Sequence, residues 1–170
     1  MNLLAVFITL VVAVAQVQQP SFLDNLRQKA ASESIQVDYE YSVAFSGFKT
    51  SGEGSVDIQG TSYHMQGNGL QIYCDGASTW LIDEVAEEVI IESADSKDAG
   101  LLANPILLLM NIEESAISYK VQGESIILNM PDGSVIDIRI KSIKTVEIKK
   151  PEAFRPPTEF PKRWIVTDLR

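Results

Sequence analysis

The side chains able to do chemistry are few in this sequence, and they do not form a recognised catalytic pattern. His64 is the single histidine and Cys74 the single cysteine of the 170 residues. A general base needs partner groups within hydrogen-bond distance, whereas His64 lies between Tyr63 and Met65. Because successive side chains of a strand point to opposite faces, we interpret His64 as a solvent-facing strand residue. Cys74 lies in an apolar segment and is interpreted as a small buried side chain.

Carboxylates and lysines form two charged clusters along the chain. Four glutamates lie close together: Glu84, Glu87, Glu88 and Glu92. Paired carboxylates can hydrolyse sugars, but acid–base work needs surroundings that separate their pKa values, and we favour a solvated turn and strand face. Four lysines follow later: Lys141, Lys144, Lys149 and Lys150. We interpret them as a solvated sheet edge, with a docking patch for an acidic partner as the alternative.

Missing motifs and net charge narrow the class of protein. The sequence contains no nucleophile elbow, no phosphate-binding glycine loop and no C-x-x-C pair. We therefore expect no enzyme, no cofactor and no metal site. The formal net charge of −9 argues against nucleic acid and anionic membranes as main partners, because both repel an acidic surface.

The first residues have the pattern of a secretory signal. Residues 3–15 are apolar and uncharged, and they end in a small-x-small cleavage site at Ala15. The run is too short for a membrane span, and a buried N-terminal helix is the alternative. We expect a signal peptide at 1–15, one domain at 16–170 and a periplasmic protein.

The positions of apolar residues predict a mainly β fold with two helices. A capping signature at Pro20-Ser21, followed by helically spaced apolar residues, predicts an N-terminal helix. Asn104 and Pro105 predict the start of a short central helix that is apolar all round. Period-two patterns and turn residues predict strands around 35–45, 54–58, 63–65, 70–74, 79–82, 88–91, 116–121, 125–130, 134–141 and 163–168. An antiparallel meander of about nine or ten strands must close or curl.

Large apolar residues at inward strand positions are the abundant feature of the chain. Most of them must form the core, but two helices are few to fill a wide sheet, so part of this face is a candidate groove for an apolar ligand. The candidate groove residues are Tyr39, Val43, Phe45, Val56, Ile58, Tyr63, Met65, Ile72, Trp80, Ile82, Val89, Ile91, Leu107, Met110, Leu128, Met130 and Ile138.

Three segments resemble the LolA family of periplasmic outer-membrane lipoprotein carriers. Asp75, Gly76 and Trp80 match the family's strand–DG–strand region, although Ile82 and Glu84 stand near its later Tyr and Pro. The segment LANPILLL at 102–109 resembles its short N-x-P-x-x-L helix. The ending is similar to that of LolA-like proteins in the Bacteroidetes, with Phe154, Phe160-Pro161 and the final VTDLR.

The resemblance implies an unclosed, curled antiparallel β-barrel with the two helices as a lid over lipoprotein acyl chains. It implies a monomeric carrier that shuttles acylated lipoproteins, or another lipid, from an inner-membrane release complex to an outer-membrane acceptor. In the family an Arg-Pro pair at the end of an early strand helps to latch the lid. Gln59-Gly60 occupies that place here, and the C-terminal extension of proteobacterial carriers is missing.

Two other classes of function stay open at this point. One is a sensor or structural module on the same fold that recognises an envelope protein or lipid. Depletion distinguishes it from a carrier, because loss of a carrier strands lipoproteins in the inner membrane. The other is an enzyme, which the scarcity of reactive groups disfavours.

Overall fold

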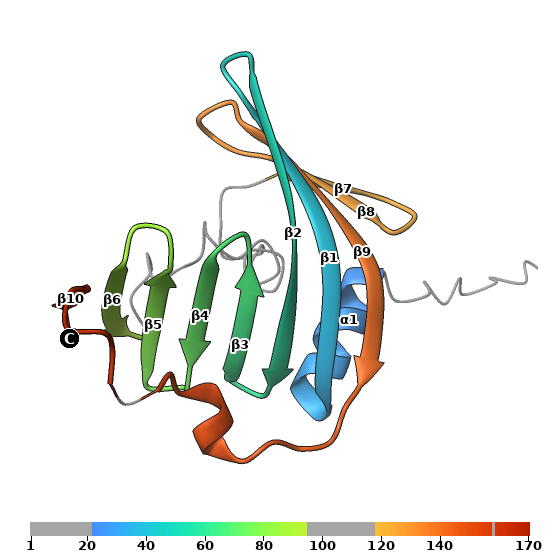
Figure 1. Ribbon diagram of the computed structural model, residues 1–170. Helices are drawn as coiled ribbons and strands as arrows, with labels where there is room; N and C mark the ends of the chain where they lie inside the picture. Colours follow the sequence, from blue (N-terminus) through green and yellow to red (C-terminus); the bar gives the residue numbers. More distant parts are fainter. Residues whose placement is uncertain (1–21, 95–117, 158) are drawn as a thin grey trace, which may run out of the picture.

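Figure 1 shows the computed structural model, which describes residues 22–94, 118–157 and 159–170. Within those ranges the chain forms one α-helix, one short 3₁₀ helix and a single ten-stranded sheet. The helices are α1 (Phe22–Ser32) and η2 (Pro151–Phe154). The strands are β1 (Ser34–Phe45), β2 (Phe48–Gln59), β3 (Ser62–Gly67), β4 (Leu70–Cys74), β5 (Ser78–Asp83), β6 (Glu88–Ser93), β7 (Ser118–Gln122), β8 (Ser125–Asn129), β9 (Val135–Thr145) and β10 (Ile165–Asp168).

The strand order confirms a mainly β fold with an unclosed sheet. The strands lie in the order β10-β6-β5-β4-β3-β2-β1-β9-β8-β7, so β10 and β7 are the two edges. All neighbours are antiparallel except β10, which pairs with β6 in parallel. The expectation of a wholly antiparallel sheet is therefore wrong at the last strand, because the chain leaves β9 and crosses back to the far edge. The predicted signal peptide and the central helix at Asn104 lie outside the described residues.

The strand β1 separates an apolar face from a charged one. Ile35, Val37 and Tyr39 are at most 1% exposed, while Asp38 and Glu40 project from the opposite face. We call the apolar side, on which α1 lies, the inner face and the other side the outer face. Leu23, Leu26 and Ala30 of α1 are buried in the same core cluster as the inner residues of β1 and β2. Burying one such aliphatic side chain contributes about 1.5–3 kcal/mol.

The lysines of β9 lie on the outer face, beside carboxylates of β1. Lys144 pairs with Asp38 at 3.3 Å and Lys141 with Glu40 at 3.3 Å. Arg139 also reaches Glu40, at 3.1 Å. β8 pairs with β9 only over residues 135–139, so Lys141 and Lys144 lie where β1 is the one strand neighbour of β9 in the described part of the chain. These lysine side chains are more than half exposed, so each pair adds little to stability.

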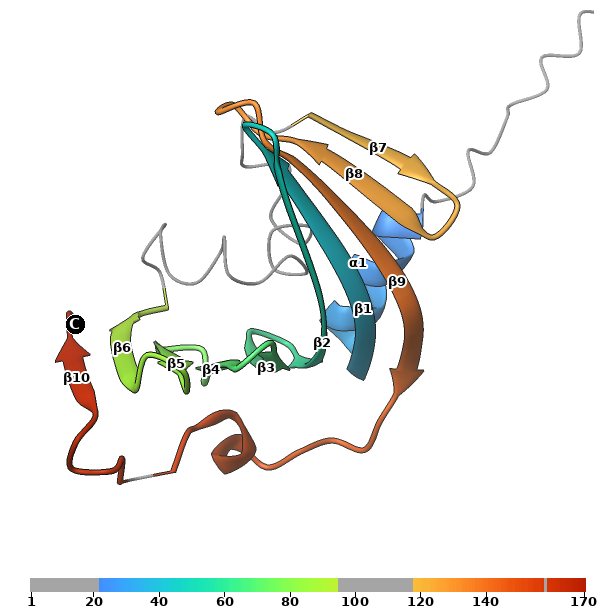
Figure 2. The same cartoon turned by 45° about the horizontal axis from the view of Figure 1, so that its top comes forward.

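The sheet bends sharply between its two halves. Figure 2 shows β3, β4, β5 and β6 lying at a steep angle to β1, β2 and β9. Two glycines, Gly54 and Gly67, allow the close backbone approach at this bend. A Cβ atom on Gly67 would lie 2.5 Å from the carbonyl oxygen of Glu53, and one on Gly54 would lie 2.8 Å from the hydroxyl of Tyr39. A Cβ on Gly52 would meet only the side chain of Asn68.

We expect Gly67→Ala to lower the free energy of unfolding by about 1–3 kcal/mol, because the new methyl group overlaps backbone that cannot move aside. Urea unfolding followed by circular dichroism measures this change. Gly52→Ala is the matched control, since the obstructing Asn68 side chain is exposed and can rotate away. Equal losses in the two variants would contradict the explanation.

Candidate functional site

Cross-strand register builds a continuous apolar row across the inner face. Val37 faces Val56, and Val56 faces Met65. The row continues through Ile72, Leu81 and Ile90. The first four of these six side chains are at most 3% exposed, whereas Leu81 and Ile90 are half-buried. Because α1 contacts β1 and β2, the row extends well beyond the strands that this helix covers.

Most of the predicted groove residues lie on this inner face. Those in or packed against its core cluster are Tyr39, Val43, Val56, Ile58, Tyr63, Met65, Ile72, Leu128, Met130 and Ile138. Phe45 lies on the same face of β1 but at the tip of the β1–β2 hairpin, where it is 48% exposed. Leu107 and Met110 lie outside the described residues.

The predicted groove residues of β5 and β6 point to the outer face. Trp80 pairs with Tyr73, whereas Ile72 pairs with Leu81, so Trp80 and Ile72 point in opposite directions. Ile82, Val89 and Ile91 accompany Trp80. The expectation that these four project with Ile72 is therefore wrong. Both faces of these strands carry apolar side chains, so the run Trp80-Leu81-Ile82 is apolar throughout and alternation does not reveal its inward side.

Several inner residues were missed by sequence reasoning. Leu81 and Ile90 follow from the register, which the sequence does not give. Ile126, Ile136 and Ile140 are at most 8% exposed, and the alternation of β8 and β9 could have identified them. Burial raises the pKa of Tyr39 and of Tyr63 far above the usual value. Both phenols therefore stay neutral, and the inner face gains no charge from them.

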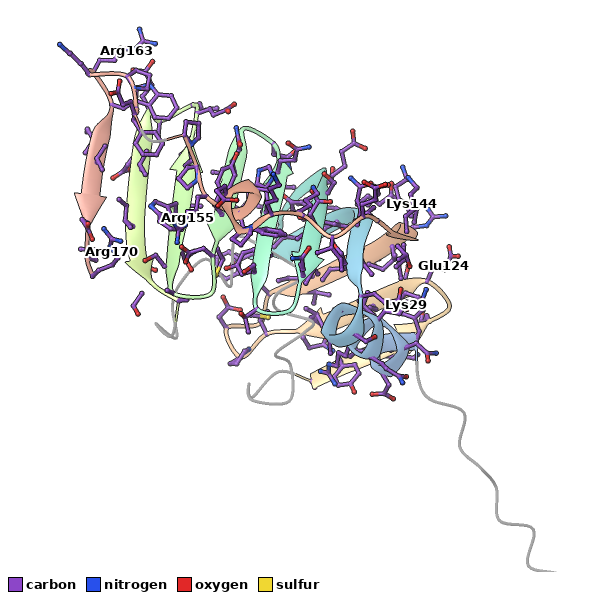
Figure 3. The ribbon with its side chains drawn as sticks, turned by 90° about the horizontal axis from the view of Figure 1, so that it is seen from below. Lys29, Glu124, Lys144, Arg155, Arg163 and Arg170 are labelled. Carbon is purple, nitrogen blue, oxygen red and sulfur yellow. The ribbon has the colours of Figure 1, made fainter. Side chains whose placement is uncertain are left out.

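The outer face is crossed by a C-terminal strap, residues 146–157 and 159–164. Figure 3 shows the strap on the opposite side of the sheet from α1, with Arg155 beside β4 and β5. The side chain of Gln59 donates from Nε2 to the carbonyl oxygen of Lys149 at 3.0 Å. It also accepts, at Oε1, from the backbone N–H of Lys149 at 2.8 Å. Gln59 thus ties the strap to the end of β2.

A second tie joins the strap to the Asp75-Gly76 turn. Arg155 donates from Nε to Oδ2 of Asp75 at 2.8 Å, and Oδ1 accepts from the backbone N–H groups of Ala77 and Ser78. Burial alone would raise the pKa of Asp75, but these hydrogen bonds and the Arg155 charge lower it below its usual value. The predicted turn is confirmed, and it also anchors the strap.

Aromatic side chains complete the docking of the strap. Phe160 and Trp164, stacked with ring centroids 6.4 Å apart, pack against the outer cluster of Trp80, Ile82, Val89 and Ile91. After Trp164 the chain pairs with β6 as β10. Trp80, one of the residues that resemble LolA-like carriers, therefore packs against the C-terminal strap in this chain.

The reactive residues do not converge on one site. His64 points outward as expected, but it is half-buried and stacked on Tyr73 with ring centroids 4.0 Å apart. Its Nε2 atom is buried without a hydrogen-bond partner. Cys74 is 3% exposed, which confirms the buried interpretation. Glu84 accepts from Gln71, and Glu87 pairs with Arg163. Among the described residues, no group of His, Cys, Asp and Glu side chains is placed to hold a metal ion.

Polar hollows lie on the outer face, beside the long strands. One of about 730 Å³ is lined by residues including Glu40, Ser42, Ser51 and Arg139. A second, of about 590 Å³, shares Glu53 with it. A third hollow of about 440 Å³, near the end of α1, is mainly apolar in lining.

The chain is only weakly similar to known proteins. No protein-family model and no curated protein sequence matches the chain. An uncharacterized conserved protein from Thermus thermophilus is 8% identical, with a TM-score of 0.49 over 86% of this chain and 96% of that one. A DUF1329 family protein from Desulfovibrio piger is 11% identical, with a TM-score of 0.46 over 78% and 94%. We draw nothing about function from either. In the described part of the chain, no helix combines the length and apolar character needed to cross a membrane.

We expect Gln59→Ala to lower the free energy of unfolding by about 2 kcal/mol, because two half-buried hydrogen bonds to the strap are lost. Gln66→Ala is the control, since its single bond to Ser55 is 3.4 Å long and exposed; it should change stability by less than about 0.5 kcal/mol. Denaturant unfolding of both variants gives the comparison. Equal free energies of unfolding for the two variants would contradict a stabilising role of the strap.

We expect His64 to make the fold less stable in acid. Burial lowers its pKa, and nearby Lys149 adds to this, against the opposing effects of Gln71 and Asp57. The unfolded chain, with a histidine pKa of about 6.5, therefore takes up the proton first, and stability is lost as pH falls through that value. His64→Phe keeps a ring against Tyr73 and should flatten stability between about pH 7 and 5.5. An unchanged slope would contradict this assignment.

Proposed function

We propose that this protein binds lipid acyl chains against its inner face and carries acylated lipoproteins between membranes in the periplasm. The observation that supports this best is the apolar row from Val37 to Ile90, which runs across both halves of a bent, unclosed sheet. Its half-buried members, Leu81 and Ile90, lie away from the strands that α1 contacts. The resemblance of three segments to LolA-like carriers points to the same class of cargo.

The energetics suit a non-covalent carrier. Each methylene removed from water contributes about 0.8 kcal/mol, so a 16-carbon chain would contribute on the order of 12 kcal/mol. The cost of ordering the chain reduces this figure. A cargo held in this way has to be handed over by a partner, so the proposal includes a releasing complex at the inner membrane and an acceptor at the outer membrane.

A sensor or structural module is the second candidate. It is favoured by the two polar hollows of the outer face, which lie on the side away from the apolar row. Such a module would recognise an envelope component through hydrogen bonds. Depletion in cells separates the two candidates: a carrier's loss leaves lipoproteins in the inner membrane, whereas a sensor's loss leaves them correctly placed.

We expect the purified protein to bind a fluorescent fatty acid and to co-purify with acyl-bearing material detectable by mass spectrometry. Leu81→Ala should weaken fatty-acid binding about tenfold, because its inward side chain loses contact worth one or two methylene groups. Ile82→Ala is the matched control, since the adjacent residue points outward, and it should bind as the parent does.

Two results would overturn the proposal. One is the absence of any acyl binding by a folded protein. The other is equal weakening by Leu81→Ala and Ile82→Ala when near-ultraviolet circular dichroism shows both variants folded, because the inner face would then have no special part in binding.

A further inference from the structure

We propose that the tip of the β1–β2 hairpin docks on a phospholipid surface. Phe45 and Phe48 are cross-strand partners on either side of a two-residue turn, Ser46-Gly47. Phe48 is 81% exposed and Phe45 48% exposed. Figure 1 shows this hairpin projecting beyond the rest of the sheet. Two phenylalanines at the end of a projection are an apolar feature that water does not favour.

The turn geometry fixes both rings at the tip. Ser46 has φ +46° and Gly47 has φ +86°. Positive φ at both central residues is the type I′ turn, whose twist matches that of the flanking strands. A Phe–Phe cross-strand pair also stabilises a hairpin, but a pair serving only that purpose would bury more of Phe48 than this one does.

The charge distribution favours lipid as the partner. The protein carries a net charge of −9, yet residues 42–51 contain no carboxylate and one lysine, Lys49. The neighbouring β8–β9 turn contains one carboxylate, Asp132. Its Oδ1 atom accepts hydrogen bonds from the backbone N–H and the hydroxyl of Ser134. Apolar insertion assisted by a basic residue is the combination that holds peripheral proteins at lipid headgroups. The acidic remainder of the protein would stay in water.

The hairpin tip is continuous with the apolar inner face of β1. Its use as an entry point for acyl chains rests on the proposed function. Tyr41, Val43 and Phe45 follow one another along the inward side of β1, and the first two pack against the core cluster. An acyl chain drawn from a bilayer would therefore meet apolar side chains from the tip to the candidate groove. The Ser46-Gly47 backbone would stay at headgroup depth, because unsatisfied peptide groups are costly in hydrocarbon.

The test is flotation of the purified protein with vesicles of phosphatidylcholine alone and with added phosphatidylglycerol. We expect the parent protein to partition to both and Phe48→Ser to lower the partition coefficient about tenfold, with a larger loss in the double variant F45S/F48S. Ile148→Ser is the matched control, because Ile148 is 82% exposed but follows the opposite end of β9. It should float as the parent does.

A second measurement places the tip directly. Phe48→Trp should gain emission that brominated lipids quench, relative to the parent with its own Trp80 and Trp164. No partition of the parent protein, or equal losses in F48S and I148S, would overturn the proposal. So would a Phe48-dependent complex with an envelope protein in the absence of vesicle binding, which would assign the tip to a protein partner.

Fatty-acid binding in solution separates this proposal from the proposed function. Phe48→Ser should bind a soluble fluorescent fatty acid as the parent does, because Phe48 belongs neither to the candidate groove residues nor to the row from Val37 to Ile90. If the parent binds no fatty acid but still shows Phe48-dependent flotation, the docking proposal stands alone. If it binds fatty acid but does not float, the carrier proposal stands and docking fails.

Discussion

Close backbone packing at the bend of the sheet is the constraint on which the rest of the structure depends. At Gly54 and Gly67 two strands approach so closely that a methyl group would meet a tyrosine or a carbonyl oxygen. Tyr39, 1% exposed, lies across Gly54 and fills the space that a side chain would otherwise occupy. The bend sets one half of the ten-stranded sheet at a steep angle to the other, and the apolar row from Val37 to Ile90 crosses from one half to the other.

The strap gives the shorter half of the sheet a second layer. Strands β4, β5 and β6 are five or six residues long, and packing against another element adds to the stability of such a small region of sheet. Gln59 and Arg155 tie the strap at its start, and Phe160 and Trp164 bury the outer side of β5 and β6. Because the strap covers the outer side, the inner side is the face that the proposed acyl chain would use.

The sequence predicted the strands well and their faces less well. In β1 polar and apolar residues alternate cleanly, because one face meets water, and Ile35 to Phe45 could be assigned residue by residue. In β5 both faces carry apolar side chains, so Trp80, Leu81 and Ile82 are all apolar and the inward residue is set by pairing with β4. The parallel pairing of β10 and the role of Gln59 depend on contacts between residues far apart in the chain, which no local pattern contains. The inward face was therefore assigned correctly over β1, β2 and β3 and reversed over β5 and β6.

The end of β2 near the hairpin tip extends beyond β3, and this free edge bears on the kind of partner that the tip can bind. β3 pairs with β2 only from Ser55 onward, so residues 48–54 of β2 have β1 as their sole strand neighbour in the described part of the chain. A partner that added a strand would use this free edge. The edge contains Lys49, Glu53 and two glycines, residue types that discourage strand addition. The apolar surface at this end is confined to Phe45 and Phe48, beyond the edge. A bilayer can take up two exposed side chains without forming backbone hydrogen bonds to the hairpin. A protein that adds a strand must form such bonds along the edge of β2. This difference favours lipid as the occupant of the tip.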